Sequence, residues 1–154
     1  MYQLLGSTRV IEASSFVAAP TAGLYLAQMG ASVIRVDQIG GGPDYRRWPK
    51  AETGASLYWE GLNKGKKSVA LDLRSGEGRE LLVELAARTG NLITNLPEKS
   101  FLSHDAIAAQ QPDGVPDLVS GRIMGWHDGR QAMDFTVNAA SGYPLMCGPE
   151  DWDP

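Results

Sequence analysis

Residues 9–37 have the sequence RVIEASSFVAAPTAGLYLAQMGASVIRVD, in which two β-branched runs enclose a helical stretch. We predict a strand at Arg9–Glu12, a helix at Ala18–Met29 and a second strand at Ala31–Asp37. Gly30 is the expected end of the helix, because glycine commonly follows the last helical turn. Strands joined by a helix in this order pair in parallel, so the stretch predicts an α/β protein.

The alternation continues after a long loop at Gln38–Ser56, which is rich in Gly, Pro, Asp and Arg. Three more strands are predicted, at Ser68–Leu73, Asn91–Asn95 and Asp117–Met124. The fold class that follows is α/β, with an open, mainly parallel, Rossmann-like sheet and helices on both faces. We expect this sheet to be incomplete, because Pro149–Pro154 end the chain without a helix that could cover the last strand.

Serine residues mark the start of two further predicted helices. Ser75 is expected to cap a helix that runs to about Arg88. Ser103 is expected to cap a short helix that runs to Gln110. The apolar spacing of the first of these helices predicts an inward stripe made of Leu81, Leu82 and Leu85.

Composition and charge limit the classes of function. The chain has 154 residues, of which 43% are apolar and 21% charged, as expected for one globular domain. A net charge of −4 argues against a nucleic-acid partner, because such partners need a basic surface. The sequence has neither a signal-peptide pattern nor an apolar run that could span a membrane, and Cys147 is its single cysteine. We therefore expect a cytoplasmic protein that does not bind membranes.

The first turn of the predicted sheet, Ser14–Pro20, is a candidate ligand site. It follows the carboxyl end of a strand and precedes a helix, which is where open α/β sheets bind ligands. The Gly-x-Gly-x-x-Gly pattern is absent, so a dinucleotide-dependent dehydrogenase is disfavoured. Ala18 and Ala19 would allow close approach of a ligand to the backbone, or would simply pack the helix on the sheet, and both interpretations stay open.

Two cationic segments are candidate anion sites. Asp44, Arg46, Arg47 and Trp48 follow three consecutive glycines, and arginine binds phosphate or carboxylate and stacks on flat rings. Asn63–Lys67 concentrates positive charge before a predicted strand. For each segment, the alternative interpretation is a solvated loop that binds no ligand.

Acid–base candidates are few. The two histidines, His104 and His127, have no neighbouring ligand spacing that resembles a metal site, so no metal is expected. His104 falls in a predicted first helical turn and His127 in a predicted exposed loop. Asp134 lies between Met133 and Phe135, and burial there would raise the pKa of its carboxyl and suit proton transfer or nucleophilic attack.

Taken together, the motifs resemble the N-terminal signatures of the family III CoA-transferases, the CaiB/BaiF type. The segments that carry this resemblance are Arg9–Glu12 with Ala18–Pro20, Leu26–Asp37, Asn63–Leu73 with Gly76 and Gly78, and Asn91–Leu96. Further segments resemble a branch that moves CoA between the two carboxyls of a branched, unsaturated C4 diacid. These are Ser15–Pro20, Gly40–Tyr45, Arg47–Pro49, Gly61–Lys66 and Asp134–Asn138.

The resemblance implies that residues 1–154 are the N-terminal part of a CoA-binding domain, with the C-terminal remainder of the family's fold absent. It implies an acyl-CoA substrate and no metal. It also implies a homodimer of interlocked subunits, or a partner chain that carries the missing part. The residues expected near the adenine and phosphates of coenzyme A are Val17, Ala18, Arg35, Leu71, Arg74, Asn95 and Leu96.

Transferases of this family use an aspartate that attacks the acyl-CoA thioester. By resemblance that nucleophile lies beyond Pro154, so we expect this chain alone to be inactive. Asp134 matches the position at which the family's racemases carry a catalytic aspartate. Two alternatives therefore stay open. One is a racemase-like enzyme that uses Asp134 and His127 for proton transfer, and the other is a non-catalytic CoA-binding or assembly chain.

Overall fold

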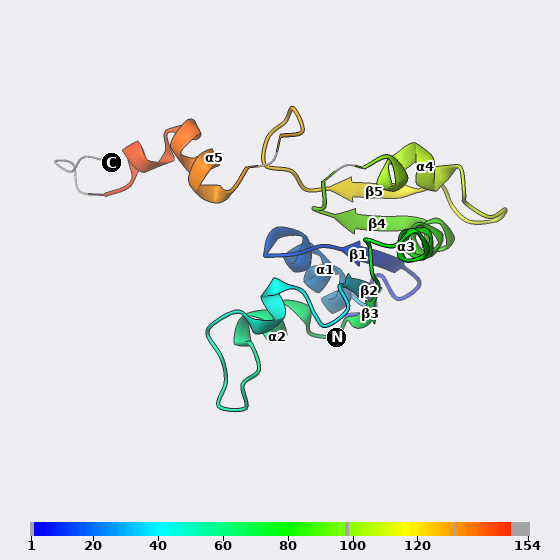
Figure 1. The fold of residues 1–154 in the computed structure, drawn as a ribbon, viewed down its shortest axis with the longest axis horizontal. Coiled ribbons are helices and arrows are strands. Elements are labelled where there is room, and N and C mark those ends of the chain that lie inside the picture. Colours follow the sequence, from blue (N-terminus) through cyan, green and yellow to red (C-terminus); the bar gives the residue numbers. More distant parts are fainter. Residues whose placement is uncertain (1, 98, 131, 149–154) are drawn as a thin grey trace. The chain divides into compact units, whose positions relative to one another are not determined.

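The computed structural model describes residues 2–97, 99–130 and 132–148. The chain divides into two compact units, Met1–Ile123 and Met124–Pro154. The first unit contains a parallel five-stranded sheet with the strand order β3-β2-β1-β4-β5 (Figure 1). Its strands are β1 Arg9–Ala13, β2 Ser32–Asp37, β3 Lys67–Ala70, β4 Asn91–Thr94 and β5 Val119–Arg122. All five predicted strands are present, the last three shorter than expected.

Helices of the first unit cover both faces of the sheet. They are α1 Ala18–Gln28, α2 Leu57–Asn63, α3 Gly76–Thr89 and α4 His104–Ala108, with short 3-10 turns η1 at Pro43–Arg46 and η2 at Ser100–Leu102. One core cluster joins the sheet to α3 and α4, and a smaller one joins it to α1. The predicted α/β class with helices on both faces is confirmed.

Local signals set the helix ends as expected. Ser75 Oγ accepts a hydrogen bond from the Gly78 N–H at the start of α3, and Ser103 Oγ accepts one from the Ala106 N–H at the start of α4. Gly30 follows α1 with a φ of +105°, a conformation that residues with a Cβ rarely adopt.

One helix was not predicted, and one prediction about a helix face was wrong. Helix α2 was not predicted, because seven residues with an interior glycine give a weak local signal. Leu81 is 42% exposed rather than inward, while Leu82 is fully buried. The buried side of α3 also includes Val83, Ala86 and Ala87, so the true inward stripe is rotated away from Leu81.

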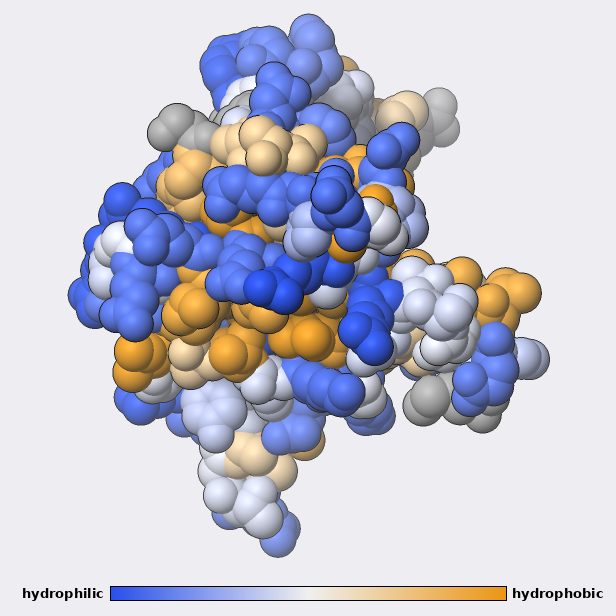
Figure 2. All heavy atoms as spheres, turned by 90° about the vertical axis from the view of Figure 1, so that its right-hand side faces the viewer, coloured by the Kyte–Doolittle hydropathy of each residue, from blue (hydrophilic) through white to orange (hydrophobic). Residues whose placement is uncertain are grey.

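Apolar side chains also reach the surface. Val119 on the edge strand β5 is 66% exposed, and Ile39 after β2 is 71% exposed. Figure 2 shows apolar residues lying between hydrophilic ones on one face of the molecule. Among the residues that the structure describes, no helix has the length and apolar character needed to cross a bilayer.

The second unit contains α5 Asp134–Ser141, which ends at Gly142 in the left-handed conformation. The 3-10 turn η3 Tyr143–Met146 follows directly. The described part of this unit has no strand, and its large apolar side chains Phe135, Leu145 and Met146 are at least 75% exposed.

Candidate functional site

The strand order reverses between β1 and β4, and open α/β sheets bind ligands at the carboxyl ends of the strands at such a point. Asn95, the residue after β4, holds the turn that follows β1 at this point of the sheet. The Asn95 side-chain amide donates to the Ser15 carbonyl at 2.7 Å, and its Oδ1 accepts from the Ser15 N–H at 3.0 Å. Thr94 Oγ1 also donates to the Ala13 carbonyl at 2.7 Å. These bonds fix the turn between β1 and α1 to its neighbour strand.

Phe16, within this turn, has a φ of +67°. Aromatic residues rarely adopt this left-handed conformation, and strained residues cluster at functional sites. The Phe16 N–H donates to the carboxylate of Asp44, which is 7% exposed, at 2.6 Å. The loop between β2 and α2 therefore holds the strained turn from a second side.

A cation lies against the ring of Phe16. The Arg47 guanidinium is 4.4 Å from the centroid of this ring and 5.0 Å from that of Tyr58, and its NH1 is 3.7 Å from Asp44 Oδ1. The Arg47 side chain remains 40% exposed. The Tyr58 hydroxyl is buried and has no hydrogen-bond partner among the described residues. Arg47 is thus a partly exposed cation that could bind an anion beside the first turn.

Helix α1 begins directly after this turn. Val17 is its N-cap and provides no side-chain hydrogen bond, so the first N–H groups of the helix have no such cap. Val17 is 39% exposed, and Ala18 is also exposed. An uncapped helix start is a favourable position for an anionic group.

Arg35, expected near coenzyme A, is 3% exposed and bonded to other protein groups. Its guanidinium donates to Asp37, Glu12, Asn63 and the Ser14 carbonyl. A direct contact with a ligand would need exposure that this side chain does not have. Arg35 lies beneath the first turn rather than on its surface.

A cavity of about 430 Å³ lies at the carboxyl ends of β2, β3 and β4. Two of the predicted CoA-binding residues, Arg74 and Leu96, line it together with Lys99. The other lining residues are Gln38, Ile39, Asp72, Leu73, Pro97, Phe101 and Leu102. Leu71 is not among them, because its side chain is part of the core between the sheet and α3.

Arg74 is 93% exposed and paired with Asp72 at 3.0 Å. Hydrogen bonds from the Arg74 side chain and backbone N–H hold the pKa of the Asp72 carboxyl below its ordinary value. The stabilisation that this carboxylate contributes is present above its ordinary pKa and is lost as the pH falls through the lowered value.

We expect Arg74→Gln to raise the pKa of Asp72 toward its ordinary value, because the main cause of the lowering is removed. A titration of the Asp72 carboxyl by NMR measures this change. Arg88→Gln, on the exposed side of α3, is the matched control and should leave the pKa of Asp72 unchanged. An unchanged pKa in Arg74→Gln would contradict the assigned cause.

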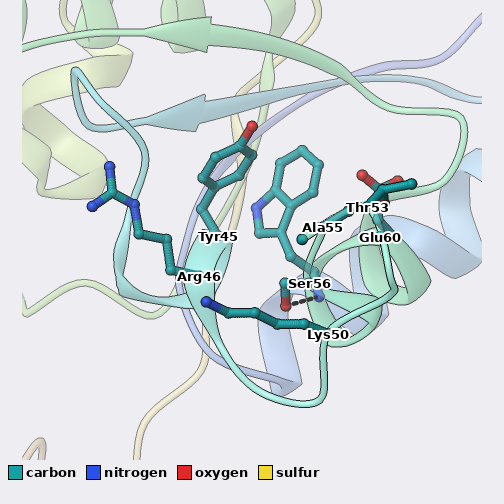
Figure 3. Close-up of a pocket in the computed structure, with 9 residues that line it drawn as sticks. Tyr45, Arg46, Lys50, Thr53, Ala55, Ser56 and Glu60 are labelled. Carbon is teal, nitrogen blue, oxygen red and sulfur yellow. Dashed lines mark hydrogen bonds between the residues drawn. The ribbon is translucent and has the colours of Figure 1, made fainter.

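A second cavity, of about 420 Å³, lies between η1 and α2. The ring centroids of Tyr45 and Trp59 are 5.3 Å apart in an edge-to-face arrangement. Figure 3 shows Tyr45 among the side chains that line this cavity. In this view Arg46 and Glu60 lie on opposite sides of the Tyr45 ring. None of the residues predicted to bind coenzyme A lines this cavity.

Asp134 is exposed in the first turn of α5, so the expected burial of its carboxyl is not found. His127 is exposed, as predicted. His104 is in the first turn of α4 and lies 2.9 Å from Ser120 Oγ. Within the described ranges, no three His, Cys, Asp or Glu residues form a group that could hold a metal ion.

The burial of two charged groups was not predicted from the sequence. Glu12 is 0% exposed, and the Lys66 side chain is 1% exposed. A carboxylate inside the apolar run RVIEA was a usable signal, because charged residues are rarely fully buried unless they are paired. Lys66 lies between Gly65 and Lys67 in a segment predicted to be an anion site or a solvated loop, and no local pattern distinguished it from the lysines around it.

Residues 5–154 match the sequence model of CoA-transferase family III, and the chain belongs to this family. The chain is 46% identical to 2-methylfumaryl-CoA isomerase of Chloroflexus aurantiacus, over 97% of this chain and 37% of that protein. It is 31% identical to succinyl-CoA:glutarate CoA-transferase of Mus musculus, over 97% of this chain and 36% of that protein. The chain thus spans little more than a third of the length of these curated relatives.

Solved structures agree with this assignment. A CAIB/BAIF family protein from Brucella suis matches with a TM-score of 0.82 and 28% identity, over 99% of this chain and 43% of that one. The family and the fold that the sequence motifs indicated are both confirmed.

Proposed function

We propose that this chain is the CoA-binding part of an enzyme that moves CoA between the carboxyls of a branched, unsaturated C4 diacid, as in mesaconyl-CoA. The similarity to a 2-methylfumaryl-CoA isomerase supports this substrate class. Because the chain covers 37% of that relative, we further propose that residues 1–154 are the N-terminal part of the CoA-binding domain. The rest of the fold would lie outside this chain.

Two features at the carboxyl ends of the strands support the proposal most directly. One is the first turn, which is held by hydrogen bonds to Asn95 and Asp44, and the other is a cavity lined by cations. Val17 and Ala18 present the uncapped start of α1, and Arg74 and Lys99 line the cavity at neighbouring strand ends. Cations and helix N-terminal N–H groups are the partners that phosphates prefer. Coenzyme A is proposed to extend along this edge, with its phosphates toward Arg74.

Arg47 is proposed to bind the free carboxylate of the acyl group. Its guanidinium is positioned by Phe16, Tyr58 and Asp44 yet keeps an exposed part. A guanidinium fixed in this way needs little further ordering to bind a carboxylate.

The covalent step is proposed to use an aspartate that attacks the thioester carbonyl, forms a mixed anhydride and releases CoA as a thiolate. We place this nucleophile after Pro154, by resemblance to the family. The exposed Asp134 is assigned at most a role in proton transfer. The active protein is proposed to be cytoplasmic and to work as a homodimer, or with a partner chain that supplies the remaining residues.

We expect Arg74→Gln to weaken binding of coenzyme A to this chain by about tenfold or more, because one lost charge-assisted hydrogen bond costs about 1.5–3 kcal/mol. Isothermal titration calorimetry with CoA measures the affinity. Arg88→Gln removes another exposed, ion-paired arginine, in α3, and this variant should bind CoA as the parent does. Absence of CoA binding by the parent chain would overturn the proposed function, and equal affinity of Arg74→Gln would remove Arg74 from the site.

A further inference from the structure

Three charged side chains form a buried cluster beneath the first turn. Glu12 in β1 is 0% exposed, Arg35 in β2 is 3% exposed, and the side chain of Lys66 before β3 is 1% exposed. Glu12 Oε1 lies 3.0 Å from Arg35 NH1, and Glu12 Oε2 lies 2.7 Å from Lys66 Nζ. One carboxylate therefore joins two cations from different elements.

The cluster holds both ends of the turn. Arg35 NH2 donates to the Ser14 carbonyl at 3.2 Å, and Ser14 Oγ donates to Glu12 Oε1 at 2.7 Å. At the other end, Lys66 Nζ donates to the Pro20 carbonyl at 2.7 Å. The residues between these two anchors are those that surround the uncapped start of α1.

The same cluster also holds α2. Asn63 Oδ1 accepts from Arg35 NH1 at 3.1 Å and from Lys66 Nζ at 2.9 Å. The Asn63 amide donates to the Trp59 carbonyl at 2.9 Å, inside α2. Tyr58 belongs to α2, and the Arg47 guanidinium lies over its ring. The cluster therefore fixes the position of these two side chains relative to the start of α1.

Stability alone is a weak reason for this arrangement. Burial lowers the pKa of the Lys66 ammonium below its ordinary value, and the neighbouring Glu12 only partly offsets this. Well-packed apolar side chains often serve as well as buried ion pairs for stability. Buried charges with several fixed partners are suited instead to holding groups at one defined position.

Gly23 shows how closely α1 is packed on the cluster. A Cβ at this helical position would lie 1.8 Å from Glu12 Oε2 and 3.3 Å from Lys66 Cε. Alanine is otherwise preferred to glycine inside a helix. The glycine therefore gives the carboxylate its space against α1.

We infer that Glu12, Arg35 and Lys66 are positioning residues that hold the turn between β1 and α1 in the conformation that binds acyl-CoA. The inference rests on the proposed function. None of the three is expected to contact the ligand. They act through the carbonyls of Ser14 and Pro20 and through Asn63.

The test uses Gly23→Ala, which keeps every ionisable group but displaces the Glu12 carboxylate. We expect the affinity for CoA, measured by calorimetry well below the melting temperature, to fall about tenfold or more while far-UV circular dichroism remains that of the parent. The matched control is Gly61→Ala in α2, where an added Cβ meets nothing within 4 Å. This control should bind CoA as the parent does.

Unchanged CoA affinity in folded Gly23→Ala would overturn the inference, since a merely structural role lowers the melting temperature without altering binding by the folded protein. If Gly23→Ala does not fold, Asn63→Ala provides the measurement, because it removes a neutral, half-buried bridge. A tenfold loss of CoA affinity there supports the inference, and an unchanged affinity overturns it. Failure of the parent to bind CoA would instead be a failure of the proposed function.

Discussion

Replacing Leu82 with alanine is expected to lower the free energy of unfolding of the first unit by about 2–5 kcal/mol. Leu82 is fully buried where α3 packs on the sheet, in the same core cluster as Ile11 and Leu92. The substitution removes apolar contacts and leaves a cavity that the close-packed core fills only in part. Urea unfolding followed by far-UV circular dichroism measures the change.

Leu81→Ala is the matched control for this prediction. Leu81 is the neighbouring residue on the same helix, with the same side chain, but it is 42% exposed. We expect its loss to be within about 1 kcal/mol, as for most surface substitutions. Equal losses at the two positions would mean that α3 presents a different side to the sheet.

The second large effect is expected at Arg35. Arg35→Ala leaves Glu12 buried with one of its two cations missing and should lower the free energy of unfolding by about 3–5 kcal/mol. Denaturant unfolding measures the loss. Arg88→Ala breaks an ion pair between side chains that are 65% and 53% exposed, and its effect should stay below about 0.5 kcal/mol.

This prediction also separates two roles of Arg35. If the side chain contacted CoA directly, as the family resemblance implied, its removal would reduce CoA affinity with little effect on stability. Because Arg35 is buried, we expect its removal to reduce the stability of the protein strongly, and not to reduce CoA affinity alone. A stable Arg35→Ala variant that loses CoA affinity would contradict the positioning role.

Much of the first unit could be predicted from local patterns. The strand, helix and strand within residues 9–37 follow from β-branched runs and from Gly30, and the starts of α3 and α4 follow from Ser75 and Ser103. These signals act over a few residues, through backbone conformation and side-chain caps. The family motifs are likewise continuous in the sequence, so the family could be recognised without coordinates.

Contacts between distant segments decided the rest. Arg35 and Glu12 are 23 positions apart, and Lys66 belongs to a third segment, so their shared burial arises only when β1, β2 and the start of β3 lie side by side. Helix α2 has no buried residue, and its position depends on contacts with distant residues, such as those of Asn63 with Arg35 and Lys66. Whether Leu81 or Leu82 faces the core depends on how α3 is rotated on the sheet, and the exposure of Asp134 depends on what surrounds α5. Burial is set by such non-local packing, which a local pattern does not contain.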